Sequence, residues 1–365
     1  MLIKLNTVEL SKCQKLLETK EANISAAEIY IDYLTNHALD ITKNDMNLLC
    51  KKYSVEEAFF KAFLKKLKIQ ENDIEFNAIN EVCNINNIKL LNDDEFLSDE
   101  FYRQISLKTD TSKDWIFTNL EYRPYEGFVY DEIEVDNSLY QEHTPIGFFN
   151  TSFPYLAVIQ GEDIWMSIIP HEINTMRDPI KEAQGNVLVL GLGLGYYAFH
   201  VSNKSNVKKV TIVEKDETVI DMFIKHILPL FPNKNKIEII CDDAIKFVSH
   251  QFNFNYVFSD IWHNVGDGLN LYLQIKAKEK INPQAKFSYW IERQMLCMLR
   301  RQVLTVYSEQ LDGSSEEDYL KAIDDNDKII NKIYFLTKDY KIESFKNLHQ
   351  LLSEDSLKVL ASKIY

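Results

Sequence analysis

The chain has 365 residues, 45% of them hydrophobic, which is enough apolar material for two cores, so two domains are expected. Its formal net charge is −14, and residues 1–184, with 18 basic against 32 acidic side chains, account for all of it. An acidic surface repels phosphate backbones, so the composition argues against nucleic acid as a partner.

Two further classes are disfavoured because their sequence signals are missing. No apolar run reaches the roughly 18 residues of a membrane span, and the first residues show no signal-like apolar region, so we expect a cytoplasmic protein without a membrane partner. The 5 cysteines show no paired spacing and no CxxC motif, so we expect reduced thiols and no metal site.

The first half of the chain changes from helical to strand patterns. Apolar residues recur with a helical period over 8–38 and 42–69, whereas the aromatic segments 115–122 and 128–135 indicate two strands joined across Arg123–Gly127. The segment YLAVIQGEDIWMSIIPHE then predicts a β-hairpin with its turn near Gly161. We expect four regions: a helical domain over 1–110, a β-rich connection over 111–184, a nucleotide-binding domain over 185–300 and a helical C-terminal segment over 301–365.

The most informative segment is VLVLGLGLGYYAFH, which begins at Val187. Its apolar run predicts a buried parallel strand, and the glycines that follow at alternate positions, Gly191, Gly193 and Gly195, predict a turn without side chains. A helix over 196–203 would point its free N–H groups at that turn, which favours a nucleotide-like ligand. In the alternative interpretation, the glycines only allow tight packing between strand and helix.

Four further strand patterns follow, and helical patterns over 216–228, 243–250 and 269–280 separate them. Strands that alternate with helices at this spacing predict an α/β fold with a doubly wound parallel sheet, whose ligands lie at the carboxyl ends of the strands. Acids stand at these ends: Glu214 after the second strand, Asp242 and Asp243 after the third, Asp260 after the fourth and Glu292 near the end of the fifth.

These residues resemble the class I S-adenosylmethionine-dependent methyltransferase superfamily and, within it, the spermidine-synthase-like branch, over about 187–292. The resemblance implies a Rossmann-like fold that binds S-adenosylmethionine or its decarboxylated relative. In this family the glycine turn passes the methionine part of the ligand, the acid after the second strand holds the ribose, and an acid after the third strand contacts the adenine. The matching positions here are Gly191, Gly193, Gly195, Glu214 and Asp243.

The chain departs from the family pattern at three positions. Methyltransferases often carry an acid at the position of Val189, and polyamine synthases place an aspartate at the position of Leu194, so both usual anchors of the ligand's amino group are missing. The aspartate that orients the amine in aminopropyl transfer is replaced by His263, whose neutral imidazole can also take a proton near pH 7. Asp260 and His263 are therefore the candidate catalytic residues.

Three functions stay open. The first is an S-adenosylmethionine-dependent methyltransferase or related alkyl transferase that acts on a small acceptor. The second is a non-catalytic adenosyl-binding or scaffold protein, which the missing anchors favour. The third is a nicotinamide-dependent oxidoreductase, whose fingerprint needs a glycine where this chain has Tyr196. The expected partner is the small-molecule acceptor, and a homodimer is left open as the assembly.

Overall fold

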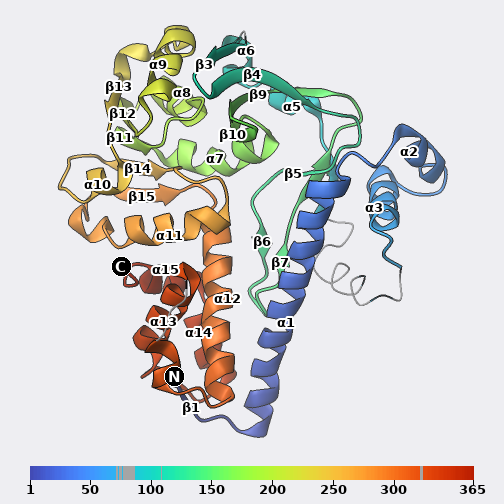
Figure 1. Ribbon diagram of the computed structural model, residues 1–365, viewed down its shortest axis with the longest axis vertical. Helices are drawn as coiled ribbons and strands as arrows, with labels where there is room; N and C mark the ends of the chain where they lie inside the picture. Colours follow the sequence, from blue (N-terminus) through green and yellow to red (C-terminus); the bar gives the residue numbers. More distant parts are fainter. Residues whose placement is uncertain (71–72, 74–75, 77–86, 108, 321–323) are drawn as a thin grey trace.

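The computed structural model describes the chain except for residues 71–72, 74–75, 77–86, 108 and 321–323. Figure 1 shows a parallel sheet with its helices in the upper half, a second sheet beside it, and long helices from both ends of the chain in the lower half. Among the described helices, none combines the length and the apolar character that a membrane span needs.

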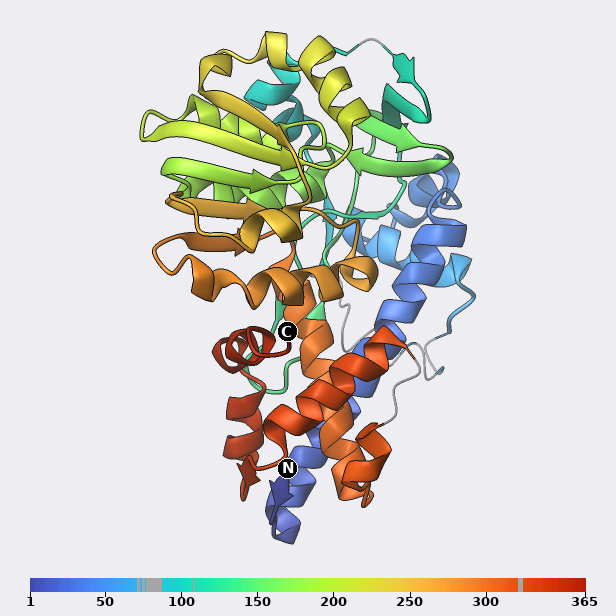
Figure 2. The same ribbon diagram turned by 60° about the vertical axis from the view of Figure 1, so that its left-hand side comes forward.

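The centre of the molecule is a five-stranded parallel sheet (Figures 1 and 2). Its strands are β11 (Gly185–Leu190), β12 (Val207–Glu214), β13 (Ile237–Cys241), β14 (Tyr256–Ser259) and β15 (Lys286–Tyr289). They lie in the order β13-β12-β11-β14-β15. The strand β11 is central, and its residues 187–190 are all apolar and buried, as a strand covered on both faces requires.

Helices connect these strands and confirm the predicted doubly wound, Rossmann-like α/β fold. They are α8 (Tyr196–Asn203), α9 (Glu217–His226), α10 (Ala244–Val248) and α11 (Val265–Lys276). Because crossovers between parallel strands are right-handed, α8 and α9 cover one face of the sheet, and α10 and α11 cover the other. From β11 the next strands are added on one side of the sheet, and from β14 they are added on the other. The crevice at the carboxyl ends of β11 and β14, where this order switches, is where such sheets bind ligands.

Two element boundaries differ from the sequence prediction. The fifth strand ends at Tyr289 rather than near Glu292, which instead begins the long helix α12 (Glu292–Leu311). The helix expected over 269–280 is α11, and it starts earlier because a capping box at Asn264 begins it. Neither difference moves an acid away from the carboxyl end of the sheet.

The predicted β-hairpin lies beside the parallel sheet and is confirmed. Strands β9 (Phe153–Gln160) and β10 (Asp163–Ser167) pair in antiparallel fashion around a turn at Gly161. They belong to a four-stranded sheet that also contains the predicted aromatic strand β4 (Trp115–Tyr122) and its partner β3 (Asp110–Ser112).

The second aromatic segment, 128–135, is not the continuous strand that its pattern predicts. It forms only β5 (Phe128–Val129) and β6 (Glu134–Val135), which pair with β8 (Ile146–Phe148) and β7 (Glu142–His143) and not with β4. Because β8 is buried along its whole length, pairing with it covers more apolar surface than an exposed hairpin with β4 would.

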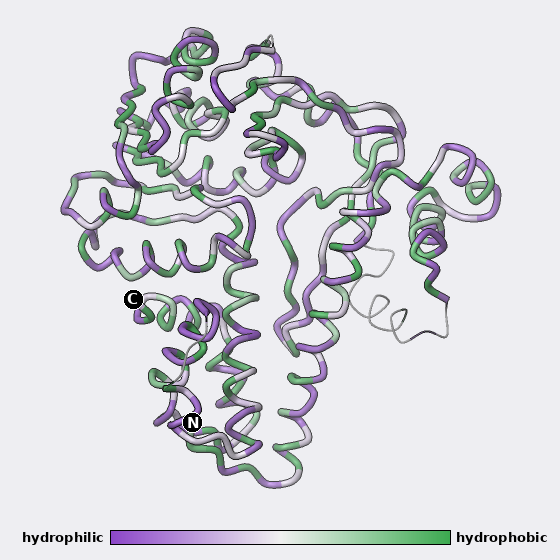
Figure 3. The backbone as a smooth tube through the Cα atoms, in the orientation of Figure 1, coloured by the Kyte–Doolittle hydropathy of each residue, from purple (hydrophilic) through white to green (hydrophobic). Residues whose placement is uncertain are grey.

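Helices from both ends of the chain pack together in the lower half of Figure 1. The long helix α1 (Thr7–Asp32) contacts α12 and α14 (Phe345–Leu351), and β1 (Leu2–Ile3) pairs with β16 (Lys341–Ile342). Figure 3 shows hydrophobic and hydrophilic residues alternating along α12, as expected for a helix with one buried face. The four-region division of the chain stays a prediction. Further elements are α2 (Lys43–Leu49), α3 (Val55–Lys66), β2 (Ile88–Leu90), α5 (Asp93–Leu97), α6 (Glu100–Gln104), α7 (Pro170–Glu182), α13 (Asp325–Thr337) and α15 (Glu354–Ala361).

Candidate functional site

A cavity of about 950 Å³ lies at the carboxyl ends of the central strands, near the upper limit of the about 300–1,000 Å³ that is usual for small-molecule sites. Of the seven site residues that the sequence predicts, the turn residue Gly195 does not line this cavity. The fold therefore brings the other six, which are far apart in the chain, to one place. These six are Gly191, Gly193, Glu214, Asp243, Asp260 and His263.

The three glycines of the turn all have positive φ: 95° at Gly191, 49° at Gly193 and 75° at Gly195. A side chain on Gly191 would overlap the carbonyl oxygen of Asp260, and one on Gly195 would lie 2.5 Å from the ring of Phe223. Backbone conformation and packing therefore require these two glycines, whether or not a ligand approaches them.

Gly193 faces the β-hairpin. A Cβ at this position would overlap the sulfur of Met166, a residue of β10 that also lines the cavity. The backbone N–H of Leu194 donates to the same sulfur at 3.1 Å. The space that the sequence assigns to the ligand is thus shared with a hairpin side chain, although the unbranched methionine can change rotamer.

Glu214 ends β12 and holds the glycine turn in place. Its Oε2 accepts from the N–H of Leu192 at 3.2 Å, and its Oε1 accepts from the N–H groups of Lys215 at 2.8 Å and Asp216 at 2.9 Å. A carboxylate has about four acceptor positions, so these bonds leave room for about one more. The predicted contact of Glu214 with a ribose is therefore compatible with its structural role.

Asp243 has the capping role that a strand-end acid often has. Its Oδ1 accepts from the N–H of Lys246 at 2.8 Å and caps α10. The neighbouring Asp242, which also lines the cavity, accepts from the N–H of Asp243 at 2.9 Å. Capping uses one oxygen of Asp243, so contact between a ligand and the other oxygen stays a prediction.

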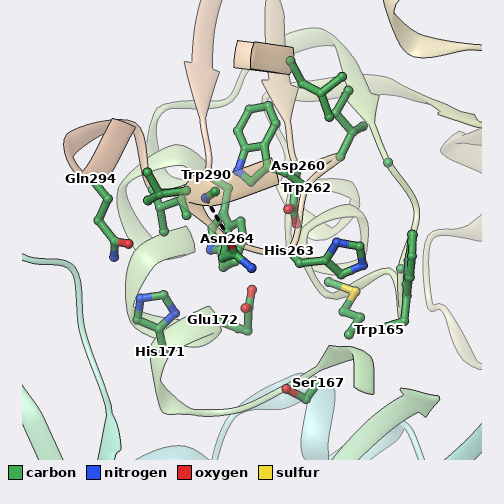
Figure 4. Close-up of a pocket in the computed structure, with 18 of the residues that line it drawn as sticks. Trp165, Ser167, His171, Glu172, Asp260, Trp262, His263, Asn264, Trp290 and Gln294 are labelled. Atoms are coloured by element: carbon green, nitrogen blue, oxygen red, sulfur yellow. Dashed lines mark hydrogen bonds between the residues drawn. The ribbon is translucent and has the colours of Figure 1, made fainter. Parts of the chain in front are cut away.

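Asp260 is paired with a carboxyl group that the sequence analysis did not single out. Glu172, near the start of α7, is only 8% exposed, and Figure 4 shows both carboxyl groups directed into the same space. Burial raises the pKa of both groups, and the charge of Asp260 raises the pKa of Glu172 further. The two carboxyls therefore titrate as a unit and retain protons at a pH where exposed acids have lost them.

His263 belongs to a different pair. Its Nδ1 lies 2.8 Å from Oδ2 of Asp267, in the first turn of α11. Its ring stands edge-on to the ring of Trp165, with 4.0 Å between the centroids, and the two lie side by side in Figure 4. His263 and Asp260 thus line the same cavity but belong to two separate groups of side chains.

Trp165, Trp262 and Trp290 also line the cavity: Trp290 has its ring 5.9 Å from that of His171, whereas Trp165 lies beside His263 on the other side (Figure 4). Burial lowers the pKa of His171 to about 4, so its ring is neutral at pH 7. Sequence reasoning missed His171, Glu172 and Trp165 because they lie on the hairpin and the helix after it, outside the strand-end pattern. The one available signal was the adjacent His and Glu at a helix start, which normally indicates only helix capping.

Comparisons with known proteins point to one family. Residues 170–308 match the family model described as the spermine/spermidine synthase domain. Polyamine aminopropyltransferases of Shigella boydii serotype 18 and Escherichia coli O81 are each 26% identical over 187 residues, which cover 46% of this chain and 62% of each relative. The chain thus spans about three fifths of the length of the curated relatives it matches.

Two solved spermidine synthase structures are also similar to part of this chain. The spermidine synthase from Thermotoga maritima is 15% identical with a TM-score of 0.30, over 40% of this chain and 55% of the other. A spermidine synthase in complex with the transition-state analogue AdoDATO is 16% identical with a TM-score of 0.30, over 40% and 54%. None of the proteins named here is an oxidoreductase. The family match agrees with the glycine turn and the strand-end acids: residues 170–308 are similar to the spermine/spermidine synthase domain.

Proposed function

We propose that this protein is a transferase that moves an alkyl group from a sulfonium donor, either decarboxylated S-adenosylmethionine or S-adenosylmethionine, to a small amine. The observation that carries this proposal is the pair formed by the buried carboxyl of Glu172 and the half-buried carboxyl of Asp260 in the crevice where doubly wound sheets bind ligands. Gly191 packs against the carbonyl of Asp260, so the pair adjoins the glycine turn that the family uses for its donor.

The charges of the cavity wall favour the decarboxylated donor. Acids outnumber bases on this wall, and one of its two basic side chains, Arg301, is already paired with Glu142. A donor that keeps the methionine carboxylate would place it at the glycine turn, near the carboxyl groups of Asp260 and Glu172, whereas the decarboxylated donor presents only positive charge. We therefore propose aminopropyl transfer as the specific reaction.

The carboxyl pair supplies a base at the place where an amine needs one. A bound sulfonium donor supplies an activated carbon and a neutral thioether as leaving group. The acceptor nitrogen attacks with its lone pair, so an ammonium must first lose a proton. The raised pKa of Asp260 makes it a stronger base than an exposed aspartate, and Glu172 accepts part of the charge. His263 with Asp267 is the second candidate for this role.

Product analysis tests the proposal. The protein is incubated with either donor and a panel of monoamines and diamines, and the nucleoside product is identified by mass spectrometry. Loss of an aminopropyl group from decarboxylated S-adenosylmethionine leaves methylthioadenosine, which we expect, whereas loss of a methyl group from S-adenosylmethionine leaves S-adenosylhomocysteine. Failure of both nucleosides to bind in calorimetry would refute the proposal.

A non-catalytic adenosyl-binding protein is the second candidate. The observation that favours it is the contact of Met166 with the glycine turn, where the sulfur occupies space beside Gly193. Binding of methylthioadenosine without formation of any product from the amine panel would support this alternative over the transferase.

A further inference from the structure

The cavity continues from the strand ends into a chamber with apolar walls. We call this part the apolar chamber, and its walls come from α1, from the residues just after it, from the β5–β6 segment and from α12. In Figure 1, the C-terminal end of α1 stands opposite α12, with β6 and β7 between them. The apolar side chains that line it are Ala27, Ile31, Leu34, Val129, Ile133 and Met298.

The charged side chains that line the apolar chamber are paired with each other. Glu142 is 3% exposed, and both of its carboxylate oxygens accept hydrogen bonds from the guanidinium of Arg301. The backbone N–H of Glu142 donates to Oδ1 of Asn23 on α1 at 3.0 Å, which holds the acid in position. A buried ion pair loses much stability when one partner is removed, so Glu142 is not free to receive a ligand cation.

The strand-end part of the cavity has the opposite character. Nε2 of His171 and Nε1 of Trp262 are buried there without a hydrogen-bond partner in the part of the chain that the structure describes. Because nearly all buried polar atoms in proteins are paired, these two nitrogens indicate a ligand that pairs with them. Glu172 and Asp260 add two carboxyls, and tryptophan faces attract cations. The two carboxyls, together with Nε2 of the neutral His171 as an acceptor, suit a basic nitrogen, whereas the indole N–H of Trp262 can donate only to an acceptor such as the lone pair of the neutral amine.

We propose that the acceptor is an amphipathic monoamine, whose one nitrogen lies at Glu172 and Asp260 and whose aliphatic or aromatic body fills the apolar chamber. This inference rests on the proposed function and names its substrate class. A linear diamine is disfavoured because its second ammonium would lie among the half-buried apolar side chains of Leu34, Val129 and Ile133, where no unpaired acid among the described lining residues can receive it. In the reaction, a nitrogen–carbon bond forms, the carbon–sulfur bond breaks, and the nitrogen's proton passes to the carboxyl pair.

A matched pair of amines tests the inference. Octylamine and its diamine counterpart differ only by a second amino group at the far end of the same chain. Each is titrated by calorimetry into protein saturated with methylthioadenosine, and each is offered with decarboxylated S-adenosylmethionine for turnover. We expect octylamine to bind at least about tenfold more tightly, because the diamine must bury an unpaired charge. Equal affinity, or a preference for the diamine, overturns the inference.

Two variants of α1 locate the selectivity. Ile31 is 63% exposed and lines the cavity, whereas Val8 is 65% exposed and does not, so a charge at either position is tolerated by the fold. Ile31→Glu adds the missing acid and should reduce the preference for octylamine by about tenfold, towards parity with the diamine, whereas Val8→Glu should leave it unchanged. The same preference in both variants overturns the inference. Failure of methylthioadenosine to bind refutes the proposed function instead.

Discussion

The two ends of the cavity are built differently. At the end that the family uses for its donor, Glu214 and Asp243 accept hydrogen bonds from backbone N–H groups of the adjoining turns. At the other end, the buried Glu172 and the half-buried Asp260 influence each other's titration, and His171 has a buried nitrogen without a described partner. Groups that the backbone already satisfies keep their geometry in an empty site, whereas buried unpaired groups gain most from a ligand. The end predicted to hold the donor is thus preorganised, and we expect the other end to discriminate between acceptors.

Removing the proposed base should have the largest effect, and it should separate the two ends of the cavity, because turnover should fall while nucleoside affinity should not. Asp260→Asn should reduce turnover by about 10²–10⁴-fold, which is the usual contribution of a positioned acid–base group, and Glu172→Gln should act in the same direction. The affinity for methylthioadenosine should stay within a few-fold, because the donor end is held by other residues. Kinetics and calorimetry measure the two effects, and an equal loss in both would show that Asp260 holds the donor.

The donor end is tested at Glu214. Glu214→Ala should weaken the binding of S-adenosylhomocysteine by about 1.5–3 kcal/mol, because a charged acceptor of ribose hydrogen bonds is lost. The melting temperature should also fall, since Glu214 holds the turn at Leu192. Glu238→Ala is the matched control, because Glu238 lies on the next strand, pairs with Lys209 and does not line the cavity. An unchanged dissociation constant would remove Glu214 from the site.

A double mutant separates the two reasons why position 193 needs a glycine, steric overlap and backbone conformation. Gly193→Ala should destabilise the protein by about 2 kcal/mol, because the new Cβ overlaps the sulfur of Met166 and the φ of 49° disfavours a side chain. Adding Met166→Ala should recover the part that is due to the overlap. Denaturant unfolding measures both variants, and no recovery in the double mutant would attribute the whole cost to backbone strain.

His263 should have a smaller effect than Asp260. His263→Ala should reduce turnover by only about tenfold, because its imidazole is paired with Asp267 away from the carboxyl pair. Asp267→Asn should reproduce this change if the two act together. A loss as large as that of Asp260→Asn would transfer the role of base to His263.

The pH dependence of stability tests the carboxyl pair without any ligand. Burial raises the folded-state pKa of Asp260 and Glu172 above their ordinary values of 3.8 and 4.5, so the folded chain binds more protons than the unfolded chain above those values. Their contribution is therefore fully present below about pH 4 and is lost as the pH rises through the raised pKa. Relative to Asp260→Asn, the wild-type unfolding free energy should fall by up to about 1.4 kcal/mol per pH unit between about pH 5 and 7. Parallel pH profiles from denaturant titrations would contradict this.

The sequence by itself determined the parallel sheet and the glycine turn at its carboxyl end. The apolar run of β11, the alternate glycines and the acids after successive strands lie within short segments, and their periods of two and 3.6 residues are local properties of the backbone. Because the carboxyl ends of parallel strands meet at one edge, the order of these segments was enough to bring Gly191, Glu214 and Asp260 to one cavity.

Only the tertiary structure decided what surrounds these residues. The pairing of Glu172 with Asp260, the contact of Met166 with Gly193 and the apolar wall that α1 contributes each join segments that are distant in the chain. The same holds for β5 in the segment 128–135, which pairs with the buried strand β8 and not with β4, the strand before it in the sequence. Contacts of this kind depend on which apolar surfaces are covered in the whole fold, so a local sequence pattern cannot predict them.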